Sequence, residues 1–199
     1  MISKPKFKIG RRLGAGVYDK CQTPKISASV RSPMGGKRPK APSEYGAQLL
    51  EKQKVRFSYG ITERQLSNYV KKAAHIKGAG STPKLLEMLE ARLDNTVYRM
   101  GLAPSRRAAR QMVSHGHFIV NLHRVTVPSY ELKLGDVIKV REGSKPRKIF
   151  ENLADRLKDY TTPPWVSFDV GTMEGRMLGK PENKETLLDL NAVLEFYSR

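Results

Sequence analysis

The stretch SRRAARQMVSHGHFIVN, residues 105–121, decides how this chain is expected to fold. Its first half has the periodicity of an amphipathic helix, in which small and apolar residues recur on one side. The apolar face of that helix consists of Ala108, Ala109, Met112 and Val113. The polar face consists of Arg106, Arg107, Arg110, Gln111 and Ser114. Gly116 then ends the helix, and the alternation in HFIVN, residues 117–121, predicts a strand.

The polar face of this helix has an unusual charge for its position. Helix N-termini carry a partial positive charge, so arginines in the first turns are mildly unfavourable. No carboxylate stands four residues away from Arg106, Arg107 or Arg110. The residues that follow add further polar and basic groups: His115, His117, Asn121, Arg124, Lys139 and Arg141. Guanidinium groups bind phosphates through paired hydrogen bonds, and double-helical RNA is recognised by its shape and phosphates. We therefore expect this face to bind RNA, with an ordinary solvated helix face as the alternative.

Short strands and one helix are expected on the C-terminal side of this stretch. Apolar residues alternate in RVTVP, residues 124–128, and in DVIKV, residues 136–140, which predicts two further strands of a small antiparallel sheet. Residues 146–158 have a helical pattern. The segment WVSFDV, residues 165–170, predicts a strand with Val166, Phe168 and Val170 facing inward.

Helical patterns dominate the N-terminal side. One helix is expected over residues 43–60, and a capping box at residues 62–65 opens a second. A third helix is expected to begin at Thr82 and Pro83, with proline at its favoured first position, and to continue to Gly101. A last helix is expected over residues 187–197. The predicted fold class is α+β: a helical lobe plus a small helix-and-antiparallel-sheet RNA-binding module.

The positive charge is concentrated in the first three quarters of the chain. The 199 residues carry a net charge of +18, and residues 1–41 hold eleven Lys and Arg against one acidic residue. Such an excess attracts polyanions, usually nucleic acid or an anionic membrane. Gly and Pro recur through residues 1–41 without an apolar period, which predicts an extended basic arm that orders on its partner. The arm residues expected to bind RNA are Arg11, Arg12, Arg31, Lys37, Arg38 and Lys40.

Other function classes find little support in the sequence. No apolar run approaches the roughly 18 residues of a membrane span, no signal peptide opens the chain, and the single cysteine forms no disulfide framework. A soluble intracellular protein is therefore expected. No serine–histidine–acid arrangement or carboxylate pair favours catalysis, so we expect no enzyme activity. His115 and His117 lack a third ligand nearby, and the glycine segments near residues 14 and 78 complete no nucleotide-binding loop, so neither a metal nor a cofactor is expected.

Longer stretches of the chain carry a resemblance to a known family. RLDNTVYRMGLAPSRRAARQMVSHGHFIVN, residues 92–121, and VPSYELKLGDVIKV, residues 127–140, resemble the RNA-binding module of the bacterial S-four family of small-ribosomal-subunit proteins. EYGAQLLEKQKVRFSYGITERQLSNYV, residues 44–70, resembles the first helices of that family. MEGRML and LEFYSR resemble its C-terminal signature, so the similarity runs from about residue 4 to the last residue.

The resemblance implies an organisation and a role. Members of the family have two lobes, which implies a basic arm at residues 1–41, a helical lobe over 42–90 and 171–199, and an RNA-binding module over 91–170 with its core at about 92–150. They bind 16S rRNA directly at a multi-helix junction in its 5′ domain and nucleate small-subunit assembly in the cytoplasm. They lie near the point where mRNA enters the subunit, beside proteins S-three and S-five, and some repress their own mRNA.

Matching the family motif residue by residue also implies a set of RNA contacts. These are Tyr45, Lys52, Arg56, Arg64, Arg92, Asn95, Arg99, Arg106, Arg107, Arg110, Ser114, His115 and His117. Charge and periodicity alone also favour the later members of this set.

The sequence departs from the family pattern at four places. Many relatives hold zinc in the arm, but the matching positions here are Phe7, Gly10, Cys21 and Ile26, so a zinc-free arm is expected. PMGGKR, residues 33–38, replaces a segment expected before the first helix, and Leu50 stands where an arginine is usual. VNLHRV, residues 120–125, lacks the Asn-Gly of a tight hairpin. Because a leucine at positive φ is strained, we expect this turn to have a different geometry, with Asn121 left-handed or the loop widened.

Two alternatives of a different class remain open at this point. Similar modules occur in RNA-modifying enzymes, which would need a separate catalytic domain, and the fifty or so C-terminal residues are too few for one. The other alternative is a free RNA-binding regulator that never joins a ribosome. An anionic membrane surface is a weaker possibility, because no helix combines a strong apolar moment with a long basic face.

Overall fold

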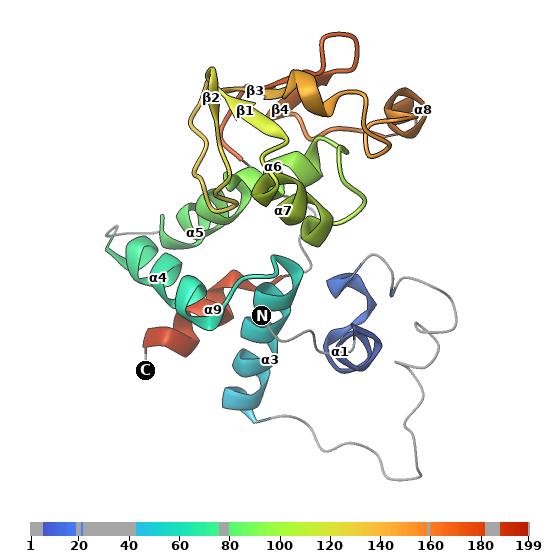
Figure 1. The fold of residues 1–199 in the computed structure, drawn as a ribbon. Helices are drawn as coiled ribbons and strands as arrows, with labels where there is room; N and C mark the ends of the chain where they lie inside the picture. Colours follow the sequence, from blue (N-terminus) through green and yellow to red (C-terminus); the bar gives the residue numbers. More distant parts are fainter. Residues whose placement is uncertain are drawn as a thin grey trace. The chain divides into compact units, whose positions relative to one another are not determined.

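The computed structural model describes residues 6–18, 21, 43–75, 80–158, 160–181 and 188–198 (Figure 1). The chain divides into two compact units. Met1–Thr82 and Lys184–Arg199 form the first unit, and Pro83–Asn183 forms the second.

The first unit is helical. It contains α1 (Lys6–Leu13), η1 (Ala15–Val17), α3 (Glu44–Ser58), α4 (Glu63–Ala74) and α9 (Leu190–Ser198). Ser43 caps α3 by accepting a hydrogen bond from the Gly46 N–H, and Thr62 and Gln65 form both bonds of the capping box at the start of α4. Both predicted helix starts are therefore confirmed. The last helix is also found, three residues later than expected, and it packs on α3 and α4.

The prediction of an extended arm is wrong for Lys6–Leu13, which form helix α1. Its buried side consists of Gly10 and Leu13, and a Cβ on Gly10 would lie 2.8 Å from the Cys21 sulfur. The helix was missed because a glycine supplies half of its buried face, and that weakens the apolar periodicity. Four residues expected to bind RNA, Arg31, Lys37, Arg38 and Lys40, lie outside the described residues.

The second unit is built on a five-stranded antiparallel sheet in the order β2-β1-β3-β5-β4. The strands are β1 (Phe118–Val120), β2 (His123–Arg124), β3 (Val137–Val140), β4 (Val166–Asp169) and β5 (Glu174–Met177). The predicted antiparallel sheet is confirmed, although only the first residue of the expected strand 124–128 is paired in a ladder. Strand β5 was not expected as a strand, and its pairing with β3 extends the sheet past residue 170.

Among the described residues, five short helical elements complete the second unit. They are α5 (Ser81–Glu90), whose first two residues still belong to the first unit, α6 (Leu93–Arg99), α7 (Arg106–Ser114), η3 (Glu142–Ser144) and α8 (Leu153–Lys158). The single helix expected from residue 82 to 101 is broken at Ala91 and Arg92. Arg92 is extended, with φ −66° and ψ 137°, and the backbone on either side bonds to residues 130–132 rather than continuing the helix. Only the last turns of the helix expected over 146–158 are formed.

The core of the second unit lies between the sheet and helices α6 and α7. Leu93 and Val97 of α6, and Met100 directly after it, join the buried face of α7 and the inward residues of every strand except β2. Val166 is buried and Phe168 packs against this core, as predicted, whereas Val170 is half-buried. A Cβ on Gly175 would lie 2.4 Å from the Met100 methyl group, so a larger residue in β5 would have to displace that side chain.

The turn between β1 and β2 is tight. Asn121 has φ 45° and Leu122 has φ 74°, so both residues are left-handed, as the right-handed twist of a two-residue hairpin requires. Asn121 is left-handed as predicted, but the prediction of a different turn geometry is wrong, because Leu122 is left-handed as well and the loop keeps two residues. The Asn121 side chain donates to the Asp136 carboxylate at 2.7 Å and accepts from the Val137 N–H at 3.0 Å, which anchors the hairpin to β3.

Candidate nucleic-acid interface

Helix α7 presents the two faces that its sequence predicts. The Ser105 side chain accepts a hydrogen bond from the Ala108 N–H and caps the helix. Ala109, Met112 and Val113 are buried in the core of the second unit. On the opposite face, Arg107, Gln111 and Ser114 are exposed. The polar side of α7 therefore faces solvent.

Two of the α7 arginines have carboxylate partners that the i+4 spacing did not reveal. Arg106 and Arg110 contact acidic residues from the segment around the break between α5 and α6. The expectation that the α7 arginines lack acidic partners is therefore wrong for Arg106 and Arg110. Their partners precede them in the sequence by 16 positions, so the i+4 spacing within α7 does not reveal them.

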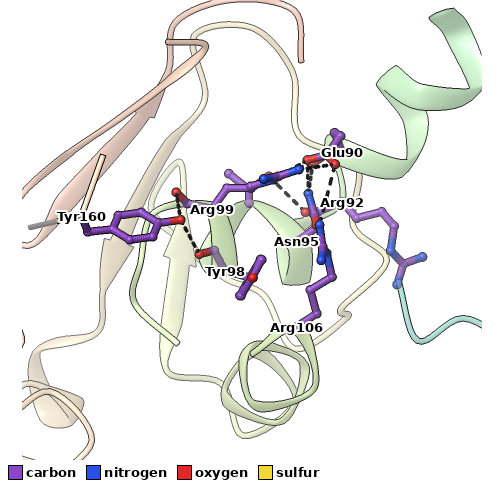
Figure 2. Close-up of polar contacts among 8 residues, drawn as sticks. Glu90, Arg92, Asn95, Tyr98, Arg99, Arg106 and Tyr160 are labelled. Carbon is purple, nitrogen blue, oxygen red and sulfur yellow. Dashed lines mark hydrogen bonds and ion pairs between the residues drawn. The ribbon is translucent and has the colours of Figure 1, made fainter. Parts of the chain in front are cut away.

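Glu90, at the C-terminal end of α5, is fully buried and is the centre of the first cluster (Figure 2). Its carboxylate accepts two hydrogen bonds from the Arg99 guanidinium, both at 2.9 Å, and one from the Asn95 amide at 2.7 Å. The Asn95 oxygen in turn accepts from Arg106 Nε at 2.7 Å. Arg106 Nη2 lies 3.9 Å from Glu90, and the guanidinium carbon lies 4.6 Å from the centre of the Tyr98 ring. The C-terminal end of α6 is held by Tyr160, whose hydroxyl donates to the Arg99 carbonyl.

Asp94 is the centre of the second cluster and is 2% exposed. Arg92 donates hydrogen bonds to both carboxylate oxygens of Asp94, at 3.0 and 2.9 Å. The Nε–H of Arg110 donates to one of the same oxygens at 2.8 Å. Four arginines therefore share two carboxylates, and the two clusters together keep a net positive charge. Arg106 and Arg110 are the surface members, with 21% and 26% of their side chains exposed.

The residues after α7 extend the basic surface. His115, Asn121 and Arg124 are exposed, and the Arg124 guanidinium lies against the backbone of Gly116, whose φ is 70°. His117 is buried, with Nδ1 2.9 Å from the Ser144 hydroxyl. Burial lowers the pKa of His117, and the nearby cations Arg147, His115, Arg141 and Arg124 lower it further. Arg147 was not among the expected RNA contacts, although the basic run SKPRK at residues 144–148 marks it.

The first unit holds a third ionic cluster, around Glu63 of α4. Lys52 Nζ and the Tyr197 hydroxyl each lie 2.6 Å from a Glu63 oxygen, and Arg56 donates to the other at 3.2 Å. Burial raises the pKa of Glu63, but the hydrogen bonds from Lys52, Tyr197 and Arg56 outweigh it, and the net shift is downward. Lys52 is buried, and its ammonium lies 4.4 Å from the centre of the Phe196 ring.

The other expected contacts of the first unit lie at its surface. Tyr45 is 53% exposed and packs its ring against Phe196 on α9. Arg11, Arg12 and Arg64 are also exposed. Across the described parts of both units, Lys52, Arg92, Asn95 and His117 are at most 7% exposed, so these four expected contacts are interior rather than surface groups.

Two further properties concern the described residues alone. They contain no group of three or more His, Cys, Asp and Glu residues placed to hold a metal ion. None of their helices has the length and apolar character needed to cross a membrane.

Comparison with known proteins identifies the family. The family model described as "Ribosomal protein S4/S9 N-terminal domain" matches residues 2–90, and the model described as "S4 domain" matches residues 91–138. The small ribosomal subunit protein uS4 of Syntrophomonas wolfei is 44% identical, in an alignment that covers 95% of this chain and 94% of the relative. The uS4 proteins of Thermus thermophilus and Thermosynechococcus vestitus are 41% and 44% identical, over 98% of this chain and 97% and 96% of theirs. The chain therefore belongs to the uS4 family of small ribosomal subunit proteins, which are RNA-binding structural components of the ribosome rather than enzymes.

Proposed function

We propose that this protein binds 16S rRNA directly, at a multi-helix junction of the 5′ domain, and thereby nucleates assembly of the small subunit. In the assembled subunit it lies near the point where mRNA enters, beside proteins S-three and S-five. The observation that carries the RNA-binding part of this proposal is the polar face of α7. There, exposed Arg107 adjoins Arg106 and Arg110, which share two buried carboxylates with two further arginines.

The chemistry of this face suits a phosphate backbone. Arginine presents a planar fork of N–H donors that matches two phosphate oxygens, and it keeps its charge at every physiological pH. Two arginines fixed by buried acids and one at the surface form a row along a single helix. Base edges in the deep major groove of A-form RNA are out of reach of side chains, so shape and phosphate positions carry the recognition.

The direct contacts that we propose in the second unit are its surface groups. They are Arg106, Arg107, Arg110, Gln111, Ser114, His115, Asn121 and Arg124. Arg92, Asn95, Arg99 and His117 lie behind them as supporting groups, with Arg99 only 17% exposed at its side chain. In the first unit, Arg11, Arg12, Tyr45, Arg56 and Arg64 are the proposed contacts.

A filter-binding titration tests this proposal. The full chain is titrated against the 16S 5′-domain RNA and against an unrelated structured RNA of equal length, at several salt concentrations. We expect tighter binding to the 16S fragment at every salt concentration, with a log–log salt slope of several units, as about six to ten phosphate contacts would give. Equal affinity for both RNAs, lost together as salt rises, would mean that the protein is only a nonspecific polycation.

A charge-reversal pair tests the face itself. Arg107→Glu is expected to weaken binding by about 10- to 100-fold, because one charge-assisted hydrogen bond contributes roughly 1.5–3 kcal/mol. It should also reduce the salt slope by about one unit. Lys158→Glu is the matched control: it makes the same change in charge at a side chain that is 71% exposed on α8. Equal effects of the two variants would show that total charge, and not the α7 face, governs binding.

A further inference from the structure

A buried acidic residue lies directly behind the proposed RNA-binding face. Its negative charge repels RNA, which is itself a polyanion. Glu90 is 0% exposed and Asn95 is 1% exposed, and both sit beneath Arg106. A negative charge at this place repels phosphate through a medium of reduced dielectric constant. Its presence therefore calls for a role other than supplying surface potential.

The hydrogen bonds around Asn95 define such a role. Its amide nitrogen donates to the Glu90 carboxylate at 2.7 Å and to the Glu90 backbone carbonyl at 3.0 Å. Both acceptors lie on Glu90, so the amide can point in only one direction, with its oxygen facing away from that residue. That oxygen accepts from Arg106 Nε at 2.7 Å (Figure 2). The Tyr98 ring, 4.6 Å from the guanidinium carbon, restricts Arg106 from a second side.

A guanidinium held in this way has lost most of its rotamer freedom before any ligand arrives. Free arginine side chains must be ordered when they bind, and ordering reduces affinity. Here the ordering is provided by the fold, through a chain of contacts from Glu90 to Asn95 to Arg106. Arg99, which donates twice to the same carboxylate, balances the charge of Glu90 inside the unit.

We propose that Glu90, acting through Asn95, is a positioning residue for RNA binding, which fixes the Arg106 guanidinium in the orientation that grips a backbone phosphate. This inference rests on the proposed RNA-binding function. It has a consequence opposite in sign to simple electrostatics, because removing a negative charge from this basic protein then weakens its affinity for a polyanion.

The same substitution one helical turn away provides the matched control. Glu87 also lies on α5 and pairs with Lys84 of its own helix at 2.9 Å, in a contact that is about one third exposed on each side. Glu87→Gln and Glu90→Gln each raise the net charge by one and keep the side-chain shape. Overall electrostatics predicts slightly tighter RNA binding for both variants. The positioning role predicts unchanged or tighter binding for Glu87→Gln and about tenfold weaker binding for Glu90→Gln.

The experiment measures the affinity of the full-length variants for the 16S 5′-domain RNA at a temperature at which circular dichroism shows each of them folded. Asn95→Ala is included as a second variant, because it breaks the link to Arg106 without changing any charge, and it decides the matter if Glu90→Gln is not folded. A double-mutant cycle adds Arg106→Gln to each of them. We expect the losses caused by Glu90→Gln and Asn95→Ala to vanish in the Arg106→Gln background.

Two results would overturn the inference. One is a folded Glu90→Gln or Asn95→Ala variant that binds as tightly as Glu87→Gln. The other is an equal loss of affinity with and without Arg106, which would mean that these residues act elsewhere. Failure of the proposed function has a different signature, because the unsubstituted protein would then show no preference for the 16S fragment.

Discussion

Arg106→Glu is expected to destabilise the second unit strongly, although Arg106 lies on the polar face of α7. The variant loses the 2.7 Å bond from Nε to Asn95, a charge-assisted hydrogen bond of roughly 1.5–3 kcal/mol. It also loses the contact with the Tyr98 ring, of about 0.5–1 kcal/mol. The new carboxylate would lie about 6 Å from Glu90, and two like charges at that separation repel by about 3 kcal/mol at an effective dielectric constant near 20. The three contributions add to about 5–7 kcal/mol.

The single tryptophan of the chain makes the assay specific to this unit. Trp165 is 4% exposed in the core of the second unit, so its fluorescence reports the unfolding of that unit in urea. Arg107→Glu is the neighbouring control, and its exposed position predicts a change within about 0.5 kcal/mol. Because both residues lie off the apolar face of α7, the sequence alone predicts that both variants leave the module folded. Predicted changes of this kind carry an error of about 1 kcal/mol. If the free energies of unfolding of the two variants differ by less than that, Arg106 is not stabilised by the contacts with Asn95 and Glu90, and the reasoning is refuted.

Three further predictions concern other contacts of the structure. Leu122→Gly is expected to stabilise the second unit by about 1 kcal/mol in the same fluorescence assay, because glycine adopts φ 74° without strain; a lower stability would contradict the assigned turn. Burial and nearby basic groups lower the folded-state pKa of His117 below its ordinary value of about 6.5. At pH values just below that ordinary pKa the unfolded chain therefore binds more protons than the folded one, so the free energy of unfolding should rise with pH up to about 6.5 and level off above it. His117→Asn should flatten this rise. Tyr197→Phe removes the 2.6 Å bond to Glu63 and should cost about 1–3 kcal/mol of first-unit stability, followed by far-ultraviolet circular dichroism; an unchanged midpoint would show that this bond contributes nothing.

Local signals in the sequence predicted the elements whose causes are local. The apolar face of α7 and the Thr62–Gln65 capping box depend on residues within one or two turns, and both are found in the structure. The family was likewise recognisable, because its motifs are long and are spread over nearly the whole chain.

The features that the sequence did not predict depend on distant partners. The helix break at Arg92 follows from backbone bonds to residues 130–132, and no periodicity within 82–101 signals them. Glu90 and Asp94 pair with arginines 9 to 16 positions further along the chain, so a test at i+4 spacing missed them. Leu122 tolerates its strained φ because Asn121 and Asp136 tie the turn to β3. Strand β5 was missed because its central residue is a glycine that makes room for Met100.

The packing of α9 in the first unit has a consequence for the order in which the nascent chain folds. Gln48 of α3 donates to Glu195 of α9 at 3.0 Å, and Tyr197 completes the cluster around Glu63, so the N-terminal helices need a segment that is translated after residues 83–183. All strands and helices of the second unit, by contrast, lie within one uninterrupted length of chain. During synthesis, the unit that comes second in the sequence is therefore the first that has all of its parts. Until α9 is translated, the N-terminal helices lack the contacts that it supplies, so the usual N-terminal-first order of vectorial folding is not expected for the first unit.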